Sequence, residues 1–378
     1  MMKKLFAVLL VLTLIFGMAM TAYADHDDYD DYDDDYYDYD DYDDDDDGDD
    51  DDDDDKAWNK PNSNEGMSIF GDEIYFGNMW GSDGKAQDRR AEIAGRHTPN
   101  TVSNTQTIAA GGATMLSINM SRCGVVVVPS TTGKFELSYI GVNDSSLIST
   151  SSAITSGTIR FTIKGNNKLE YVNSNPESRV NVVLLKVPAA IRSVYISEGN
   201  GSVHLTGLTV PIKGETGSGI IKVMGNTLNA GYDLSAKNGS VILEGGTIGG
   251  KIDLSAKNGN VKINGKTVSG DIDLSADNGK ASLTANTLGG AELDCDNGEL
   301  ELNVGVITGH VKAEVDNGKI IANLREAPVN LTLNITSRSP AGKITLPTGW
   351  SNNSVFGTGI PRLSLSCKNG SIVLTNNA

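Results

Sequence analysis

The chain has 378 residues, 49 acidic against 31 basic, and a formal net charge of −18 at pH 7. Residues 25–55 alone contain 23 aspartates and no lysine or arginine, which leaves 26 acidic against 31 basic residues elsewhere. Because that remainder is nearly neutral and has no basic stripe, the composition argues against a nucleic-acid partner.

The first predicted element is a secretory signal peptide over residues 1–24. A lysine pair precedes an apolar run over residues 5–20, and Ala-Tyr-Ala at 22–24 matches a cleavage signature. The run is shorter than the roughly 18–20 residues that a membrane-spanning helix requires, and no second long apolar run follows. We therefore expect export through the Sec pathway, a secreted or cell-surface location, and no transmembrane segment after cleavage.

The next segment, residues 25–55, is an Asp/Tyr-rich tail that we predict to be disordered. Its aspartates repel one another, and the segment has almost nothing to bury. Two roles stay open for it. It could bind Ca²⁺ or other divalent cations weakly, or it could be a spacer that keeps the folded domain away from the membrane or cell wall.

Residues 56–104 are predicted to be a linker with a short ordered cap. The segment contains a small aromatic patch made of Phe70, Tyr75, Phe76 and Trp80. Such a patch could contact a ligand, but the stronger expectation is that it covers the open end of the repeat domain that follows.

Residues 105–378 form a repeat domain with a period close to 20. Asn-Gly recurs at nearly constant spacing, and its members are predicted to be structural corners: Asn238, Asn258, Asn278, Asn297 and Asn317, with Gly239, Gly259, Gly279, Gly298 and Gly318. Gly219 fills the same position one repeat earlier, and Asn369-Gly370 fills it later. A fixed period of this length is typical of solenoids.

When the repeats are aligned on this glycine, equivalent positions form columns. The columns at five and three residues before the glycine are apolar, and so are those at two and four residues after it. The columns between them are polar, so each repeat is predicted to be strand, corner, strand. The predicted fold is all-β: a single-stranded parallel β-helix with about 20 residues per coil, preceded by the disordered acidic tail. Stacked coils place like residues on like, so the asparagines should form an amide ladder. The glycine is expected to supply a corner with positive φ.

A meander of hairpins is the structural alternative, because Asn-Gly is also a strong hairpin signal. It does not explain why one column keeps its residue type every 20 positions. The three cysteines, Cys123, Cys295 and Cys367, are interpreted as small buried residues rather than a disulfide framework. From their spacing, Cys295 and Cys367 are expected about three coils apart, too far to bridge.

The region from about 105 to 378 resembles a bacterial family of exported β-strand-repeat domains of unknown function labelled putative adhesins. The resemblance rests on CGVVVVPSTTGKFELSYIG at 123–141, LLKVPAAIRSVYISEGNGSVHLTG at 184–207, and the recurring (S/D)-x-x-N-G-x-(V/I/L) coils. It implies a β-helix-like solenoid, right-handed by the usual crossover rule. It implies no known catalytic residues and no established ligand.

One column raises a metal hypothesis. Asp233, Asp253 and Asp273 stand six residues before successive corner glycines, and outward carboxylates about 5 Å apart repel each other. A bound Ca²⁺ would relieve that repulsion. The simpler interpretation, which we favour, is a solvated face screened by salt and by neighbouring lysines such as Lys237 and Lys257, with no metal and no cofactor.

The sequence predicts a protein that is not an enzyme. Carbohydrate-active β-helices need clustered carboxylates and aromatic platforms for sugar rings, and residues 234–348 contain no Phe, Tyr or Trp. The leading functional expectation is an adhesin or cell-envelope binding module that holds an unknown glycan or protein ligand through a repetitive polar surface. The alternatives are a self-associating structural scaffold of the envelope and a polysaccharide lyase or hydrolase.

Overall fold

The described part of this computed structural model comprises residues 68–70, 73–75, 102–141, 146–166, 182–340 and 342–377. The chain divides into two units, Met1–Pro61 and Asn62–Ala378, and the description below concerns the second. The predicted signal peptide, the acidic tail, Phe76 and Trp80 lie outside the described residues. For Phe70 and Tyr75 only the backbone is described, so the predicted cap stays a prediction.

All regular secondary structure in the described residues is β-strand. Two short strands, β1 (Ser68–Phe70) and β2 (Glu73–Tyr75), form an antiparallel pair. The other 22 strands belong to one sheet. They are β3 (Val102–Ile108), β4 (Met115–Ser121), β5 (Gly124–Pro129), β6 (Phe135–Ile140), β7 (Ile148–Thr155), β8 (Thr158–Gly165), β9 (Val182–Val187), β10 (Ser193–Glu198), β11 (Ser202–Thr206), β12 (Ile212–Thr216), β13 (Ile220–Leu228), β14 (Tyr232–Ala236), β15 (Ser240–Ile248), β16 (Lys251–Ala256), β17 (Asn260–Val268), β18 (Asp271–Leu288), β19 (Ala291–Ile307), β20 (Val311–Leu324), β21 (Leu331–Ser337), β22 (Ile344–Thr345), β23 (Val355–Phe356) and β24 (Arg362–Asn376).

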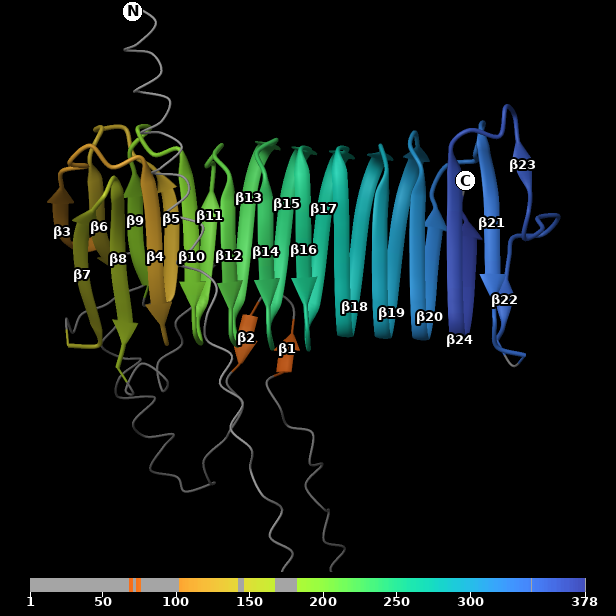
Figure 1. Ribbon diagram of the computed structural model, residues 1–378, viewed down its shortest axis with the longest axis horizontal. Helices are drawn as coiled ribbons and strands as arrows, with labels where there is room; N and C mark the ends of the chain where they lie inside the picture. Colours follow the sequence, from red (N-terminus) through yellow and green to blue (C-terminus); the bar gives the residue numbers. More distant parts are fainter. Residues whose placement is uncertain are drawn as a thin grey trace, which may run out of the picture. The chain divides into compact units, whose positions relative to one another are not determined.

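The middle of this sheet is a parallel solenoid. Each strand from β10 to β16 pairs in parallel with the strand two places further along the chain. In the pair of β14 and β16, for example, Leu234 lies beside Leu254. Strands β10, β12, β14 and β16 form a first face, and β11, β13, β15 and β17 form a second face (Figure 1). In β18, β19, β20 and β24 one strand runs unbroken through the corner and contributes to both faces. The predicted parallel β-helix with coils of about 20 residues is confirmed.

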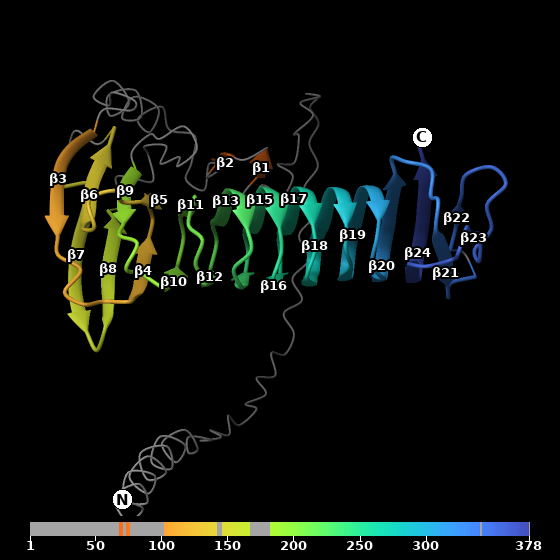
Figure 2. The same cartoon turned by 90° about the horizontal axis from the view of Figure 1, so that it is seen from above.

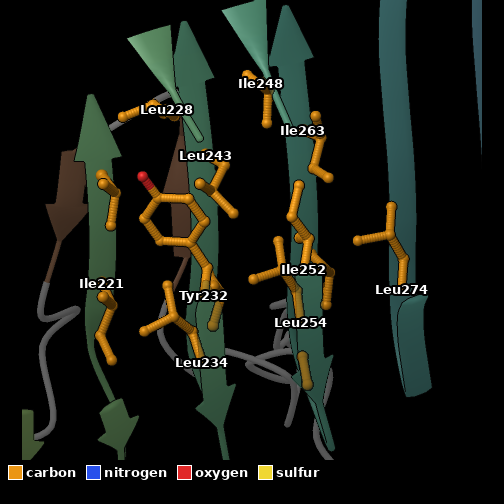
Figure 3. Close-up of a cluster of buried hydrophobic side chains, with 14 of the residues drawn as sticks. Ile221, Leu228, Tyr232, Leu234, Leu243, Ile248, Ile252, Leu254, Ile263 and Leu274 are labelled. Carbon is orange, nitrogen blue, oxygen red and sulfur yellow. The ribbon is translucent and has the colours of Figure 1, made fainter. Parts of the chain in front are cut away.

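The core lies between the two faces, where alternate residues of each strand point inward. Leu234, Leu254 and Leu274 on the first face meet Leu243 and Ile263 on the second (Figure 3). Each of these side chains is essentially fully buried. Burying a leucine or isoleucine in this way contributes about 1.5–3 kcal/mol. The apolar columns read from the sequence are therefore the core rows of the solenoid.

The Asn-Gly corner carries a continuous amide ladder. Asn258 Nδ2 donates to Asn238 Oδ1 at 2.8 Å, and Asn278 Nδ2 donates to Asn258 Oδ1 at 3.0 Å. The same bond repeats from Asn297, Asn317 and Asn369 to the asparagine one coil below, at 3.1, 3.0 and 3.0 Å. The predicted ladder is thus present, and it ties six coils together along one exposed edge.

The glycines of this corner meet the predicted requirement in part, and a second requirement adds to it. Gly279, Gly298, Gly318 and Gly370 have positive φ, between 147° and 159°, whereas Gly239 and Gly259 do not. A Cβ built on Gly259 would lie 1.8 Å from the carbonyl oxygen of Gly239. Close stacking of backbone on backbone therefore excludes a side chain here. Positive φ also occurs at the opposite corner, at Gly250 (88°) and Gly270 (115°).

Both ends of the solenoid depart from sequence order. At one end the β4–β5 coil lies between β10–β11 and the pair β8 and β9. At the other end β24 lies between β20 and β21. Antiparallel strands complete each end. At the first end β7 pairs with β8, β6 pairs with β9, and β3 pairs with β6. At the second end β23 pairs with β21. Figure 2 shows these two groups at opposite ends of the row of coils.

Aromatic side chains close the two ends. Phe135 and Phe161 pack at 5.4 Å between ring centroids at the first end, and Trp350 packs on Phe356 at 4.7 Å at the second. Large rings suit these places because an end must cover the cross-section of the core without another coil above it. The coils from β15 to β20 cover each other and contain no Phe, Tyr or Trp.

The three cysteines are free and buried, as the sequence suggested. Burial raises the pKa of the Cys123 thiol to about 12 and that of Cys295 to about 11, so both thiols are kept protonated. The expected spacing of three coils between Cys295 and Cys367 is wrong. Because β24 pairs directly with β20, only Val315 separates them, at two strand spacings or roughly 10 Å. That distance still exceeds the reach of a disulfide.

Candidate binding surface

A row of carboxylates crosses the first face. Asp233, Asp253, Asp273 and Glu292 are direct neighbours on successive strands, all exposed and pointing away from the core. The row ends in ammonium groups: Lys213 Nζ lies 2.7 Å from Asp233, and Lys312 Nζ lies 2.7 Å from Glu292. The column predicted from the sequence is therefore real, and Lys213 and Lys312 neutralise its two ends.

The carboxylates in the middle of this row, such as Asp273, still repel one another. Partial burial raises the pKa of Asp273, and the carboxylates of Asp253, Glu292 and Asp271 raise it further. Asp233 in turn holds the pKa of Lys213 above its ordinary value. Within the described residues, no three His, Cys, Asp or Glu side chains converge on a position that could hold a metal ion. Calcium binding by Asp233, Asp253 and Asp273 stays a prediction.

Rows of neutral polar side chains run parallel to the acidic row. Ser235, Ser255 and Ser275 lie in register on the same face, two residues along each strand from the aspartates. A threonine row occupies the second face and consists of Thr227, Thr247, Thr267 and Thr287. The asparagine ladder lies on the corner between the two faces. Hydroxyl, amide and carboxylate groups thus each repeat at one strand spacing, about 4.8 Å.

A groove of about 430 Å³ crosses the beginnings of β10, β12, β14 and β16. Its lining combines apolar and charged side chains: Met115, Tyr195, Pro211, Lys213, Asp233 and Lys251. Tyr195 Oη donates a hydrogen bond to Glu215 Oε1 at 3.2 Å, and its pKa is raised by burial and then by Glu215. An aromatic ring beside paired charges can contact a sugar ring or a peptide.

The sequence prediction missed this groove. The available signal was that Tyr195 and Lys213 extend the aspartate column upstream, to the two coils before Asp233. Those coils lie before the first regular Asn-Gly repeat, so the column alignment did not reach them.

Glu198 is a buried carboxylate that the sequence prediction also missed. It lies on the inward column otherwise filled by alanine, cysteine and valine, one strand pair from Thr216. The Thr216 hydroxyl donates to Glu198 Oε2, while Oε1 is buried without a hydrogen-bond partner in the structure. Burial raises the pKa of Glu198 to about 7, and the bond from Thr216 opposes that rise. The carboxyl group is therefore partly protonated near neutral pH.

The described histidines are structural. His310 Nδ1 accepts a hydrogen bond from the backbone N–H of Arg362 at 3.0 Å, which ties β24 to the loop before β20. His204 is buried on β11. His26 and His97 lie outside the described residues. No described segment forms a helix with the length and hydropathy needed to cross a membrane.

Comparison with known proteins gives a family and several structural likenesses. Structures similar to this chain include a putative cell adhesion protein from Clostridium sporogenes ATCC 15579 (12% identity, 73% of this chain and 99% of that chain covered, TM-score 0.25). They also include putative adhesins from Bacteroides fragilis NCTC 9343 (16%, 73% and 97%, 0.32) and Parabacteroides merdae ATCC 43184 (13%, 73% and 96%, 0.35). Comparison with curated proteins gives no match.

The family model that matches describes a repeat family of unknown function. It is the Toastrack DUF4097 model, and it matches residues 79–359, which is more than half of the chain. The match spans the coils and both irregular ends except β24. The chain belongs to the Toastrack DUF4097 family.

Proposed function

We propose that this protein is an exported, non-catalytic binding module of the cell envelope, an adhesin in the broad sense, whose ligand is a repetitive polymer such as a glycan. The observation that carries the proposal is the set of in-register polar rows: serine and aspartate on the first face, threonine on the second, and asparagine on the corner between them. Each row offers the same group once per coil.

A surface of this kind binds by repetition. One hydroxyl or amide contact with a sugar contributes little, because it replaces a contact with water. Several identical contacts along one polymer act together, because the first contact raises the effective concentration of the next. The groove beside Tyr195 and Lys213 supplies the place where the rows gain an aromatic ring and fixed charges.

The test is a binding screen of the mature protein against immobilised glycans and extracellular-matrix proteins, followed by titration with oligomers of increasing length. Affinity is expected to rise by about 10²-fold or more as the oligomer grows from one coil spacing to several. A triple variant, Ser235→Lys with Ser255→Lys and Ser275→Lys, is expected to remove binding if the first face carries it. The same change on the second face, Thr247→Lys with Thr267→Lys and Thr287→Lys, is expected to remove binding if the threonine row carries it instead.

Three results would contradict the proposal. The first is affinity that does not depend on oligomer length. The second is binding that survives both triple variants. The third is release of shortened polymer during the titration, which would indicate a lyase or hydrolase instead.

A further inference from the structure

Four strands at one end of the second face are buried on both sides. Their outward column consists of Val126, His204, Lys222 and Ile242, which are neighbours on β5, β11, β13 and β15. These side chains point away from the core, yet they are only 4%, 3%, 2% and 7% exposed. An outward side chain on a bare sheet would be partly exposed.

The next outward column behaves in the same way. Ser202, Ile220 and Ser240 are neighbours on β11, β13 and β15 and are 5%, 2% and 2% exposed. The burial ends abruptly at β17, where Asn260 and Lys262 continue the two columns and are half-exposed. One coil further, the Lys280 side chain is 38% exposed. We call the area formed by these seven outward residues of β5, β11, β13 and β15 the covered area.

Val126 packs against Ile140 and Val182, but the other strands of the large sheet do not account for the cover over β11, β13 and β15. The strands in extensive contact with β13 are its sheet neighbours β11 and β15 and the first-face strands β12 and β14. All of these lie beside the covered area or on the core side of it. The Oγ atom of Ser240 is buried and has no hydrogen-bond partner in the structure. Something other than the described coils therefore excludes water from this area.

We propose that the cover is a segment of the same chain, residues 67–80, which contain the β1–β2 pair. A two-stranded pair of this size is only marginally stable alone and needs an apolar surface beneath it. The segment supplies large apolar side chains, among them Phe70, Tyr75, Phe76 and Trp80. It belongs to the same compact unit as the sheet, which begins at Asn62.

The length of chain allows this docking. Residue 81 is connected to β3 through residues 81–101, and β3 leads to β15 through β6, β9, β5, β11 and β13. Six strand spacings amount to roughly 29 Å. A chain of 21 residues reaches roughly 70 Å when extended, so residues 67–80 can reach every part of the covered area.

Charge favours the same occupant. Lys222 lies at the centre of the covered area and forms an ion pair with Glu244 at 3.1 Å. A lysine excluded from water requires compensating carboxylates. Residues 65–73 contain Glu65, Asp72 and Glu73 and no lysine or arginine, so the docked segment brings negative charge to this position.

The test begins with thiol accessibility in the full mature chain. Ser240→Cys and Lys280→Cys place a thiol on the same outward column, inside and outside the covered area. The native cysteines are buried and contribute little background. The Ser240→Cys thiol is expected to react with maleimide at least about 100-fold more slowly than that of Lys280→Cys. Adding Phe76→Asp and Trp80→Asp should return most of that reactivity.

A photo-crosslink identifies the occupant. Met224→p-benzoylphenylalanine places the probe at the rim of the covered area, and Thr284→p-benzoylphenylalanine, three coils away on the same row, is the control. The first is expected to crosslink within one chain to the peptide containing residues 67–80, and the second is not. A crosslink to residues 167–181, or to a second copy, would overturn the proposal. Equal maleimide rates for Ser240→Cys and Lys280→Cys, or no effect of Phe76→Asp and Trp80→Asp, would also overturn it.

Discussion

The middle coils and the two ends of this domain use different physical solutions for the same problem of covering a core. In the middle, from β15 to β20, each coil covers the next, so small and medium aliphatic side chains stack in rows and the corner requires glycine. At the ends no further coil follows. There the chain turns back, inserts a strand out of order and closes the cross-section with rings such as Phe161 and Trp350. Stacking of equivalent coils therefore covers the core in the middle, and large side chains cover it at the ends.

The largest expected effect is at the corner of the middle coils. Gly259→Ala places a Cβ 1.8 Å from the Gly239 carbonyl oxygen, and only a shift between coils can relieve that overlap. We expect a loss of at least about 4 kcal/mol or failure to fold, measured by urea denaturation followed by circular dichroism. Gly231→Ala is the control, because its Cβ meets nothing closer than 3.9 Å. Similar midpoints for the two variants would show that stacking distance does not constrain the corner.

The next effect is at the first end. Phe161 is fully buried and packs on Phe135 of β6, so Phe161→Ala leaves a cavity that no neighbouring coil can fill. A loss of about 4 kcal/mol is expected in thermal or urea unfolding. Ser152 is its exposed cross-strand partner on β7, and Ser152→Ala should change stability by less than about 0.5 kcal/mol. If Phe161→Ala were as mild as its control, the ends would not depend on ring size.

A smaller effect depends on pH and lies where the first end meets the middle. Burial raises the pKa of Glu198 to about 7 in the folded protein, above its ordinary value of 4.5. The folded state therefore binds the proton more tightly, and the associated stability is complete below about pH 4.5 and is lost as the pH rises through about 7. Glu198→Gln should remove a decline of about 3 kcal/mol between about pH 5 and pH 8.5.

The Glu198 prediction has an internal comparison. Thr216→Val removes the hydroxyl that stabilises the ionised carboxylate, so the decline should start at the same pH, extend to a higher pH and become larger. Thermal melts across the pH range measure both variants. A wild-type protein whose melting temperature is flat over this range would contradict the buried, partly protonated state of Glu198.

The smallest expected effect concerns the amide ladder. Asn278→Ala removes two exposed hydrogen bonds, to Asn258 and from Asn297. The expected loss is about 1 kcal/mol in urea unfolding, because each exposed bond exchanges with water. Asp277→Ala, on the neighbouring exposed residue, is the control. A combined Asn278→Ala and Asn297→Ala variant should lose less than the sum of the single losses, since the two residues share one bond.

Much of the middle could be predicted from the sequence, because stacked coils carry the same type of residue at equivalent positions. Leu234, Leu254 and Leu274 recur at the same position relative to the corner glycine, so strand, register, core row and ladder all follow from one alignment. The second reason for the glycine did not follow. Both a positive φ and a close approach select glycine: Gly279 shows both, whereas Gly259 shows only the close approach to Gly239.

The ends and the site could be predicted much less well. Asn369 follows Asn317 by 52 residues, and the intervening excursion hides the fact that β24 and β20 are neighbours. The acidic row was predicted from Asp233, Asp253 and Asp273, but Lys213 and Tyr195 occupy coils where the repeat has degenerated. Lys312 lies in a regular coil, where a lysine replaces the acidic residue of the column. Glu198 was not predicted either, because it also lies in a coil where the repeat has degenerated. A column alignment has predictive power only where the repeat is regular.

The insertion of β24 between β20 and β21 has a consequence for the order of assembly. Strand β24 is the last described strand of the chain, and a ribosome synthesises it after both of its neighbours. Until it arrives, β20 and β21 have no partner between them. Most solenoids can add or lose their final coil one unit at a time. Here the coil of β24 closes only after residues 362–376 have been synthesised, so a truncated product lacking them would leave two strand edges open instead of a slightly shorter solenoid.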